Sequence, residues 1–344
     1  MKKEALSEFL NSLKEFGDLW APVKKKDGYA FEKIDDVSKV DLTYTRTTIP
    51  LKKFFAPPKT PLVKYDLTGY EKEHEIVEYV RMNEQRKQII FGAHPCDINA
   101  ILILDKLFLN NYADPYYLAR RQNSIIIGHS CLPDDKCMCK STDTDTVDEG
   151  FDLFFTELDD HYLVWVGSSL GDDLIRANSK FFDENITNKD IAEYSQWRKK
   201  RDNMFKTKID FDSMPDFMEL AYNSQLWDEL GSKCLSCGSC SMVCPTCNCY
   251  NVFDDIDIPE FTGERYRVWD SCMFKEYSLV AGGHNFREAR SQRLKLYYTH
   301  KLKAYIGQYG KPSCVGCGRC VAACPVNINV LTVAKALTEE VIVK

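Results

Sequence analysis

The sequence predicts a two-domain protein, with an α/β or α+β domain over residues 1–205 and a mainly α-helical domain over residues 206–344. Three observations support this prediction. A chain of 344 residues is long enough to form two hydrophobic cores. Its first part alternates short apolar runs with helical patterns, whereas its last third combines helical patterns with closely spaced cysteines. The boundary is placed in the polar segment between residues 180 and 230, where the hydrophobic pattern is weak.

The N-terminal elements follow from hydrophobic periodicity. Apolar residues recur at helical spacing among glutamates near the start of the chain, which predicts an amphipathic helix and not a signal peptide: Leu6, Phe9, Leu10, Leu13 and Phe16. Residues 89–91 and 125–127 are typical of buried strands, and residues 100–109 have the length and leucine content of a helix between them. The runs 151–158 and 161–166 predict a hairpin with Asp159 and Asp160 in its turn.

The C-terminal part is expected to consist of helices and cysteine loops, with helices near residues 287–305 and 330–339. Two segments are strongly charged. Residues 287–303 carry six Lys or Arg, and residues 134–160 carry ten Asp or Glu. Either segment is typical of a solvated surface, and either could also steer a partner.

Composition excludes several classes of protein. A net charge of −6 argues against general binding of nucleic acid. The longest apolar candidate for a membrane span, residues 89–109, is interrupted by polar residues and a proline, so no span is predicted. The expected location is therefore cytoplasmic. The chain has 15 cysteines, an odd number that cannot form a complete set of disulfides, and cytoplasmic cysteines in such number favour metal binding.

Two segments share the spacing C-x2-C-x2-C-x3-C-P. The first contains Cys234, Cys237, Cys240 and Cys244, and the second contains Cys314, Cys317, Cys320 and Cys324. This spacing is typical of [4Fe–4S] clusters, and in two-cluster ferredoxins the fourth cysteine of each motif binds the other cluster. Structural zinc is the alternative, but it needs two cysteine pairs and not this repeated pattern of four. The C-terminal domain is therefore expected to be ferredoxin-like.

The spacing predicts the ligands of each cluster. The first cluster is assigned to Cys234, Cys237, Cys240 and Cys324, and the second to Cys314, Cys317, Cys320 and Cys244.

A third set of cysteines is less regular: Cys96, Cys131, Cys137 and Cys139. Cys96 and Cys131 each follow a predicted strand, so these thiols could converge on a third [4Fe–4S] cluster or on zinc, or remain unligated. His94 could replace one of them, although a lone histidine beside a proline is more often structural.

Three further cysteines, Cys247, Cys249 and Cys272, have no clear motif. They could line the first cluster, form a further site or pack as small apolar side chains, and packing or support of a cluster is favoured. The sequence also lacks a dinucleotide-binding glycine motif, a Walker loop, a nucleophile elbow and an HExxH helix. This combination is typical of an electron carrier without a catalytic pocket.

Several stretches together resemble the β subunits of soluble NAD(P)-linked nickel–iron hydrogenases (sulfhydrogenases), which share a wider family with the iron–sulfur subunits of anaerobic sulfite reductases. The likeness extends from residue 18 to residue 328 and includes the segments 21–23, 44–50, 91–98, 114–117, 137–139, 244–250, 269–272 and 280–287. Met138 stands where this family usually has an aromatic residue, and the thiols on either side are retained.

The resemblance implies an electron-transfer subunit of a cytoplasmic complex. Such a subunit relays single electrons between a flavin subunit that handles NAD(P)H and a catalytic subunit with a nickel–iron centre. The resemblance also supports the third [4Fe–4S] cluster. Two alternatives remain at this point: a sulfite reductase with a siroheme subunit, and a cluster-based redox sensor that relays no electrons.

Overall fold

The computed structural model describes residues 1–66, 77–79 and 87–342. Its larger sheet has six strands in the order β2-β1-β5-β6-β7-β8, and the central strands β1, β5, β6 and β7 are parallel. The strands are β1 (Asp18–Lys25), β2 (Gly28–Lys33), β5 (Gln88–Ala93), β6 (Ser124–His129), β7 (Leu153–Glu157) and β8 (Tyr162–Val166). The mixed α/β character predicted for the N-terminal region is thus confirmed, as are the strands near 89 and 125 and the β7–β8 hairpin.

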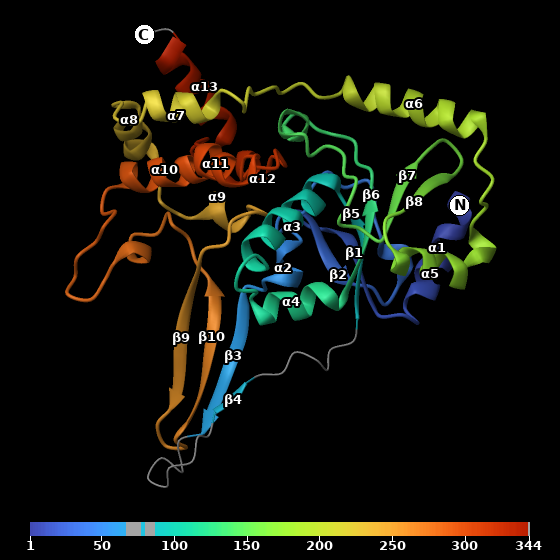
Figure 1. Ribbon diagram of the computed structural model, residues 1–344, viewed down its shortest axis with the longest axis horizontal. Coiled ribbons are helices and arrows are strands. Elements are labelled where there is room, and N and C mark those ends of the chain that lie inside the picture. The colour runs from blue at the N-terminus through green and yellow to red at the C-terminus, as the bar shows by residue number, and fades with distance from the viewer. Residues whose placement is uncertain (67–76, 80–86, 343–344) are drawn as a thin grey trace.

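Helices cover both faces of this sheet (Figure 1). They are α1 (Leu6–Leu13) and α5 (Ser169–Ala177) on one face, and α2 (Lys52–Phe55), α3 (Pro95–Phe108) and α4 (Pro115–Gln122) on the other. Side chains alternate between the faces: Ile89 and Ile125 pack toward α1 and α5, whereas Ile90 packs toward α3. Because both faces of the sheet are buried, β5 and β6 contain continuous apolar runs at residues 89–91 and 125–127.

The helix α3 begins directly after β5. His94 precedes the first helical residue, and Pro95 occupies the first turn, where its missing N–H costs no hydrogen bond. This junction fixes Cys96 at the carboxyl end of β5. The predicted helix at 100–109 therefore exists but begins five residues earlier.

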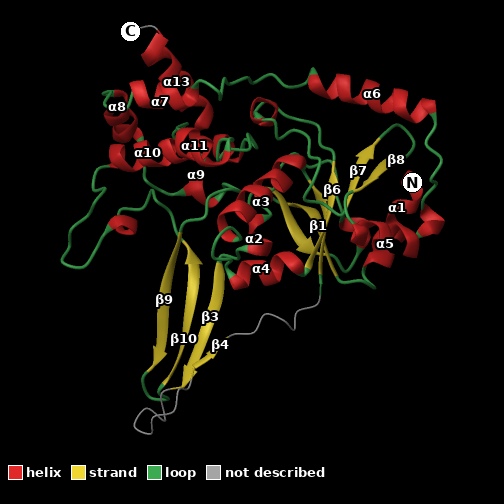
Figure 2. Cartoon of the chain, in the orientation of Figure 1, coloured by secondary structure: helices red, strands yellow, loops and turns green. Residues whose placement is uncertain are grey.

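A second sheet projects from the body of the molecule as an arm (Figures 1 and 2). Its antiparallel strands have the order β4-β3-β10-β9, with β3 (Lys59–Asp66), β4 (Val77–Tyr79), β9 (Tyr250–Asp257) and β10 (Thr262–Trp269). The expectation of only helices and loops after residue 230 was wrong for β9 and β10. Every residue of β9 is exposed, so this strand lacks the buried alternation that marks a strand in a sequence.

The C-terminal helices lie close together (Figure 2), and their apolar side chains form one core. They are α7 (Met214–Leu220), α8 (Leu226–Lys233), α9 (Ser239–Met242), α10 (Arg290–Thr299), α11 (Tyr305–Tyr309), α12 (Arg319–Ala323) and α13 (Val330–Ile342), with a π-helical turn at His300–Ala304; α6 (Asn188–Asp202) precedes them. Short 3₁₀ turns occur at Lys3–Ala5, Val37–Lys39, Cys139–Thr142, Ser179–Phe181 and Glu276–Ser278. Within the residues described, no helix combines the length and apolar character that a membrane span requires.

Candidate metal centres

The first cysteine motif lies between α8 and the segment after α9. Cys234 ends α8, Cys240 lies within α9 and Cys237 is exposed. Gly238 is the N-cap of α9 and has a φ of 71°, a left-handed conformation that glycine adopts without strain. Several other thiols lie close enough to Cys240 to influence its charge, and we call such thiols electrostatic neighbours. Those of Cys240 are Cys234, Cys244, Cys320 and Cys324.

The second motif brings its own thiols together with one thiol of the first. The Cys244 thiol is an electrostatic neighbour of Cys314, Cys317 and Cys320. Cys240 has both Cys244 and Cys324 as neighbours, so the exchange of fourth ligands between the two motifs stays a prediction. Burial raises the pKa of Cys240 and of Cys320 to about 12. These thiols would be protonated at neutral pH unless a metal replaced the proton.

The third set converges at the edge where parallel strands end. Cys96 follows β5 and Cys131 follows β6, and the loop after β6 supplies Cys137 and Cys139. The Cys139 thiol has the other three as neighbours, and Cys96, Cys137 and Cys139 lie in one buried cluster. The ring of His94 stacks on that of Tyr44, with centroids 3.9 Å apart.

Two arginines contact this third set. Arg46 donates from Nη2 to the Cys137 sulfur at 3.3 Å and from Nε to the Cys317 carbonyl at 3.2 Å. Arg201 donates to the Cys131 carbonyl at 2.7 Å. Burial raises the pKa of the Cys131 thiol to about 11 although Arg201 opposes the shift, and a hydrogen bond with Cys139, aided by Arg46, lowers the pKa of Cys137 to about 7. Positive charge is thus placed where bound thiolates would be negative.

The third set lies directly against the second motif. Met138 donates its amide hydrogen to the Gly316 carbonyl at 2.7 Å, and the Thr144 hydroxyl donates to the Val315 carbonyl at 2.8 Å. A Cβ on Gly316 would lie 2.4 Å from the Met138 carbonyl carbon. The absence of a side chain at Gly316 therefore permits the contact between the two loops.

The thiol sets do not match the geometry of a single zinc ion held by three or four cysteines. Tetrahedral zinc with Zn–S bonds of about 2.3 Å places its sulfurs roughly 3.8 Å apart. Within the described part of the chain, no three thiol sulfurs lie all within 4.8 Å of one another. A cuboidal cluster holds its thiolates on separate iron corners and so farther apart, and the buried, cation-lined thiol sets fit such a cluster.

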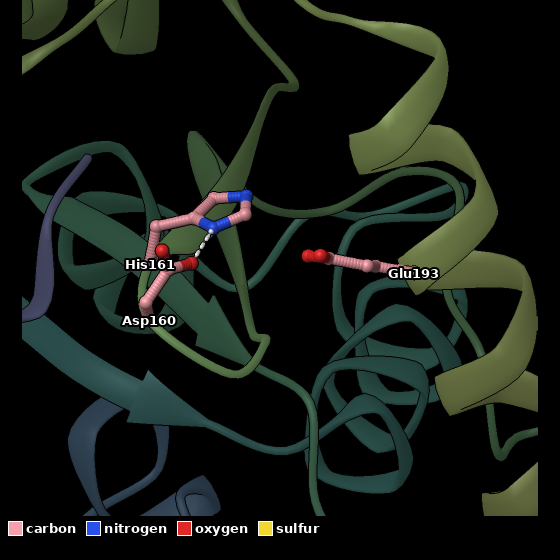
Figure 3. Close-up of side chains that lie close together, drawn as sticks. All are labelled: Asp160, His161 and Glu193. Carbon is pink, nitrogen blue, oxygen red and sulfur yellow. Dashed lines mark hydrogen bonds and ion pairs between the residues drawn. The ribbon is translucent and has the colours of Figure 1, made fainter.

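The tight group of metal-ligand atoms that the structure does contain has a simpler explanation. Asp160, His161 and Glu193 bring one ligand atom each within 4.8 Å (Figure 3). The His161 ring contacts Asp160 at 2.7 Å and Asp190 at 3.3 Å, and Glu193 pairs with Lys189 at 3.3 Å. These contacts form an ion-pair network that links α6 to the β7–β8 turn, and surface pairs of this kind are common without a metal.

Comparison with known proteins agrees with this chemistry. Residues 233–328 match a family model described as a 4Fe-4S dicluster domain. The chain is 39% identical over 342 residues to sulfhydrogenase 2 subunit beta of Pyrococcus furiosus, and the alignment covers 99% of this chain and 98% of that protein. The chain belongs to the sulfhydrogenase beta-subunit family. The resemblance drawn from the sequence is therefore confirmed. No solved structure matches the chain.

The dicluster match covers only some of the cysteines of this beta-subunit homologue, whereas the family relationship covers the whole chain. The matched dicluster segment includes both cysteine motifs and also Cys247, Cys249 and Cys272. The set at Cys96 and Cys131–Cys139 lies outside that segment. Sequence reasoning assigned no role to Arg46, which lies in the family-like segment 44–50, or to Arg201, and both reach the third set from distant positions.

Proposed function

We propose that this chain relays single electrons within a cytoplasmic nickel–iron hydrogenase complex, between a flavin subunit that handles NAD(P)H and the catalytic subunit. Family membership and the dicluster domain support the role of an iron–sulfur electron-transfer subunit. The two C-terminal clusters would be held by the exchanged ligand sets described above, and a third [4Fe–4S] cluster by the set with Cys96. A [4Fe–4S] cluster accepts and donates one electron at a time.

One observation carries the relay: the second thiol set lies beside both the first and the third, and we refer to the three sets as a row. Cys240 of the first set neighbours Cys320 of the second, and Cys317 of the second packs against the buried cluster that contains Cys96. The row begins at Cys237, whose side chain is exposed. A row with one end at the surface suits electron exchange with a partner protein.

The side chains around the three thiol sets supply positive charge and exclude water. Arg46 and Arg319 supply positive charge near the second and third sets, and the buried Lys301 does so near Cys244 and Cys314. The apolar residues around the sets exclude water, and limited solvent access is one of the factors that set a cluster's potential.

Metal analysis of the native complex, purified anaerobically through this chain, tests the proposal. Nickel alongside abundant iron supports it, and hydrogen-driven reduction of NAD(P) by the same preparation would then be assayed. Siroheme absorption without nickel would place the relay in a sulfite reductase instead. A preparation that fails to re-oxidise with artificial acceptors after reduction by dithionite would overturn the relay itself and leave a redox sensor.

A further inference from the structure

The three cysteines outside the recognised sets line one cavity. Cys247, Cys249 and Cys272 form part of the wall of a cavity of about 570 Å³, and the thiols of Cys249 and Cys272 lie beside each other. The remaining walls include Tyr277, Arg287, Tyr297, His300 and Lys301. The same three cysteines also pack in the C-terminal apolar core, so it is the cavity beside them that distinguishes them from ordinary core residues.

The β9–β10 hairpin brings these cysteines together. Cys247 and Cys249 precede β9, and Cys272 follows β10. Tyr250 pairs with Trp269 at the base of the hairpin, and Asp270 donates its amide hydrogen to the Cys249 carbonyl at 2.9 Å. The two strands therefore fix the Cys-x-Cys segment beside the cysteine that lies more than 20 residues later.

Buried positive charge surrounds the thiols. Lys301 is 2% exposed and donates to Thr246 Oγ1 at 2.7 Å and to the Ser313 carbonyl at 3.0 Å. Lys52 is 5% exposed and donates to the Cys247 carbonyl at 3.0 Å. Within the described residues, neither lysine forms an ion pair with a carboxylate, and their negatively chargeable neighbours are cysteine thiols. A buried ammonium requires a compensating anion, which thiolates on a metal centre would supply.

The dimensions favour a cluster over a single ion. The three sulfurs do not all lie within 4.8 Å of one another, whereas a tetrahedral zinc site would hold them roughly 3.8 Å apart. We propose that Cys247, Cys249 and Cys272 bind an additional iron–sulfur cluster through three thiolates, with the remaining iron facing the cavity. The thiols of Cys244 and Cys247 lie beside each other, so the additional site adjoins the second cluster. Of the three roles that the sequence left open for these cysteines, the proposal takes the one in which they form a further metal site.

Iron and acid-labile sulfide, measured per chain on the anaerobically purified full chain, test the site. Cys272→Ala should remove about four iron and four sulfide, as Cys317→Ala should at the second cluster. Leu296→Ala, which changes the same cavity wall without removing a thiol, should retain the wild-type content. Unchanged iron in Cys272→Ala would overturn the proposal while leaving the relay intact, and so would one zinc per chain that this variant alone loses.

Cys272→Ala could lose more than one cluster because it fails to fold. Alkylation of the wild-type chain then tests the additional site without a substitution. Iodoacetamide labelling followed by peptide mass spectrometry should leave Cys247 and Cys249 unmodified in the iron-loaded protein. Both should become labelled once iron is removed by a chelator. Labelling of these cysteines while the full iron content remains bound would show that they are free thiols.

Discussion

Asp97 and Arg319 form an ion pair in the protein interior, with Oδ1 and Nη1 2.8 Å apart and side chains 1% and 2% exposed. Asp97 follows Cys96 of the third thiol set, and Arg319 lies between Cys317 and Cys320 of the second motif. Arg319 also donates from Nε to the Thr47 carbonyl at 2.8 Å. One guanidinium therefore fixes the position of the second motif relative to the N-terminal sheet.

Asp97→Asn should destabilise the protein by about 3 kcal/mol, because it leaves the buried Arg319 charge without its partner. Anaerobic denaturant unfolding would measure the change. Glu32→Gln is the matched control, since it breaks the Lys25–Glu32 pair, whose side chains are 46% and 44% exposed, and should cost less than about 1 kcal/mol. Equal costs for the two variants would contradict the importance assigned to the buried pair.

Arg46→Gln should lower the reduction potential of one cluster by on the order of 50 mV, because the reduced cluster carries one more negative charge and loses a nearby cation. Redox titration followed by electron paramagnetic resonance would measure the shift. Arg265→Gln, in the exposed pair with Asp254 on the β9–β10 arm, should leave every potential unchanged. Equal shifts in the two variants would mean that Arg46 acts only through net charge.

Pairs of cysteine substitutions can test the exchanged fourth ligands. Cys240→Ala combined with Cys324→Ala should remove about four iron atoms, since both residues are assigned to one cluster. Cys240→Ala combined with Cys244→Ala should remove about eight, since the two are assigned to different clusters. The opposite result, with the larger loss in the first pair, would show that each motif binds its own cluster.

Removal of iron should loosen the C-terminal part more than the N-terminal sheet. Each exchanged ligand joins two motifs roughly 80 residues apart, so loss of metal removes two cross-links at once. Hydrogen–deuterium exchange should increase strongly in peptides covering residues 234–244 and 314–324. Uptake in β7 should change little, because its neighbours are strands and not thiols. Uniform loosening would mean that the two parts unfold together.

The sequence predicted features whose determinants are local. The cysteine motifs identify their residues by spacing alone, and the β5 and β6 strands are recognisable because both faces of the sheet are buried. The β7–β8 hairpin is recognisable because its turn interrupts two apolar runs.

Features that depend on distant partners were not predictable. Arg46 reaches Cys317 across 271 residues of sequence, and no pattern around Arg46 indicates that contact. The strand β9 carries Val252, Phe253 and Ile256 on exposed positions, so its apolar residues do not mark a buried face. Because the hairpin was not predicted, the approach of Cys272 to Cys249 was not predicted either, and the sequence favoured packing or support of a cluster for Cys247, Cys249 and Cys272.

The pairing of β3 with β10 has a consequence for how the protein is made. Roughly 200 residues separate the two strands. At a synthesis rate of about 5–20 residues per second, β10 is therefore synthesised on the order of ten seconds or more after β3. The parallel sheet can form on the ribosome during this interval, whereas the arm cannot be completed. Cys324 is synthesised after β10, so we expect the first cluster, to which Cys324 is assigned, to be completed only after the arm has closed.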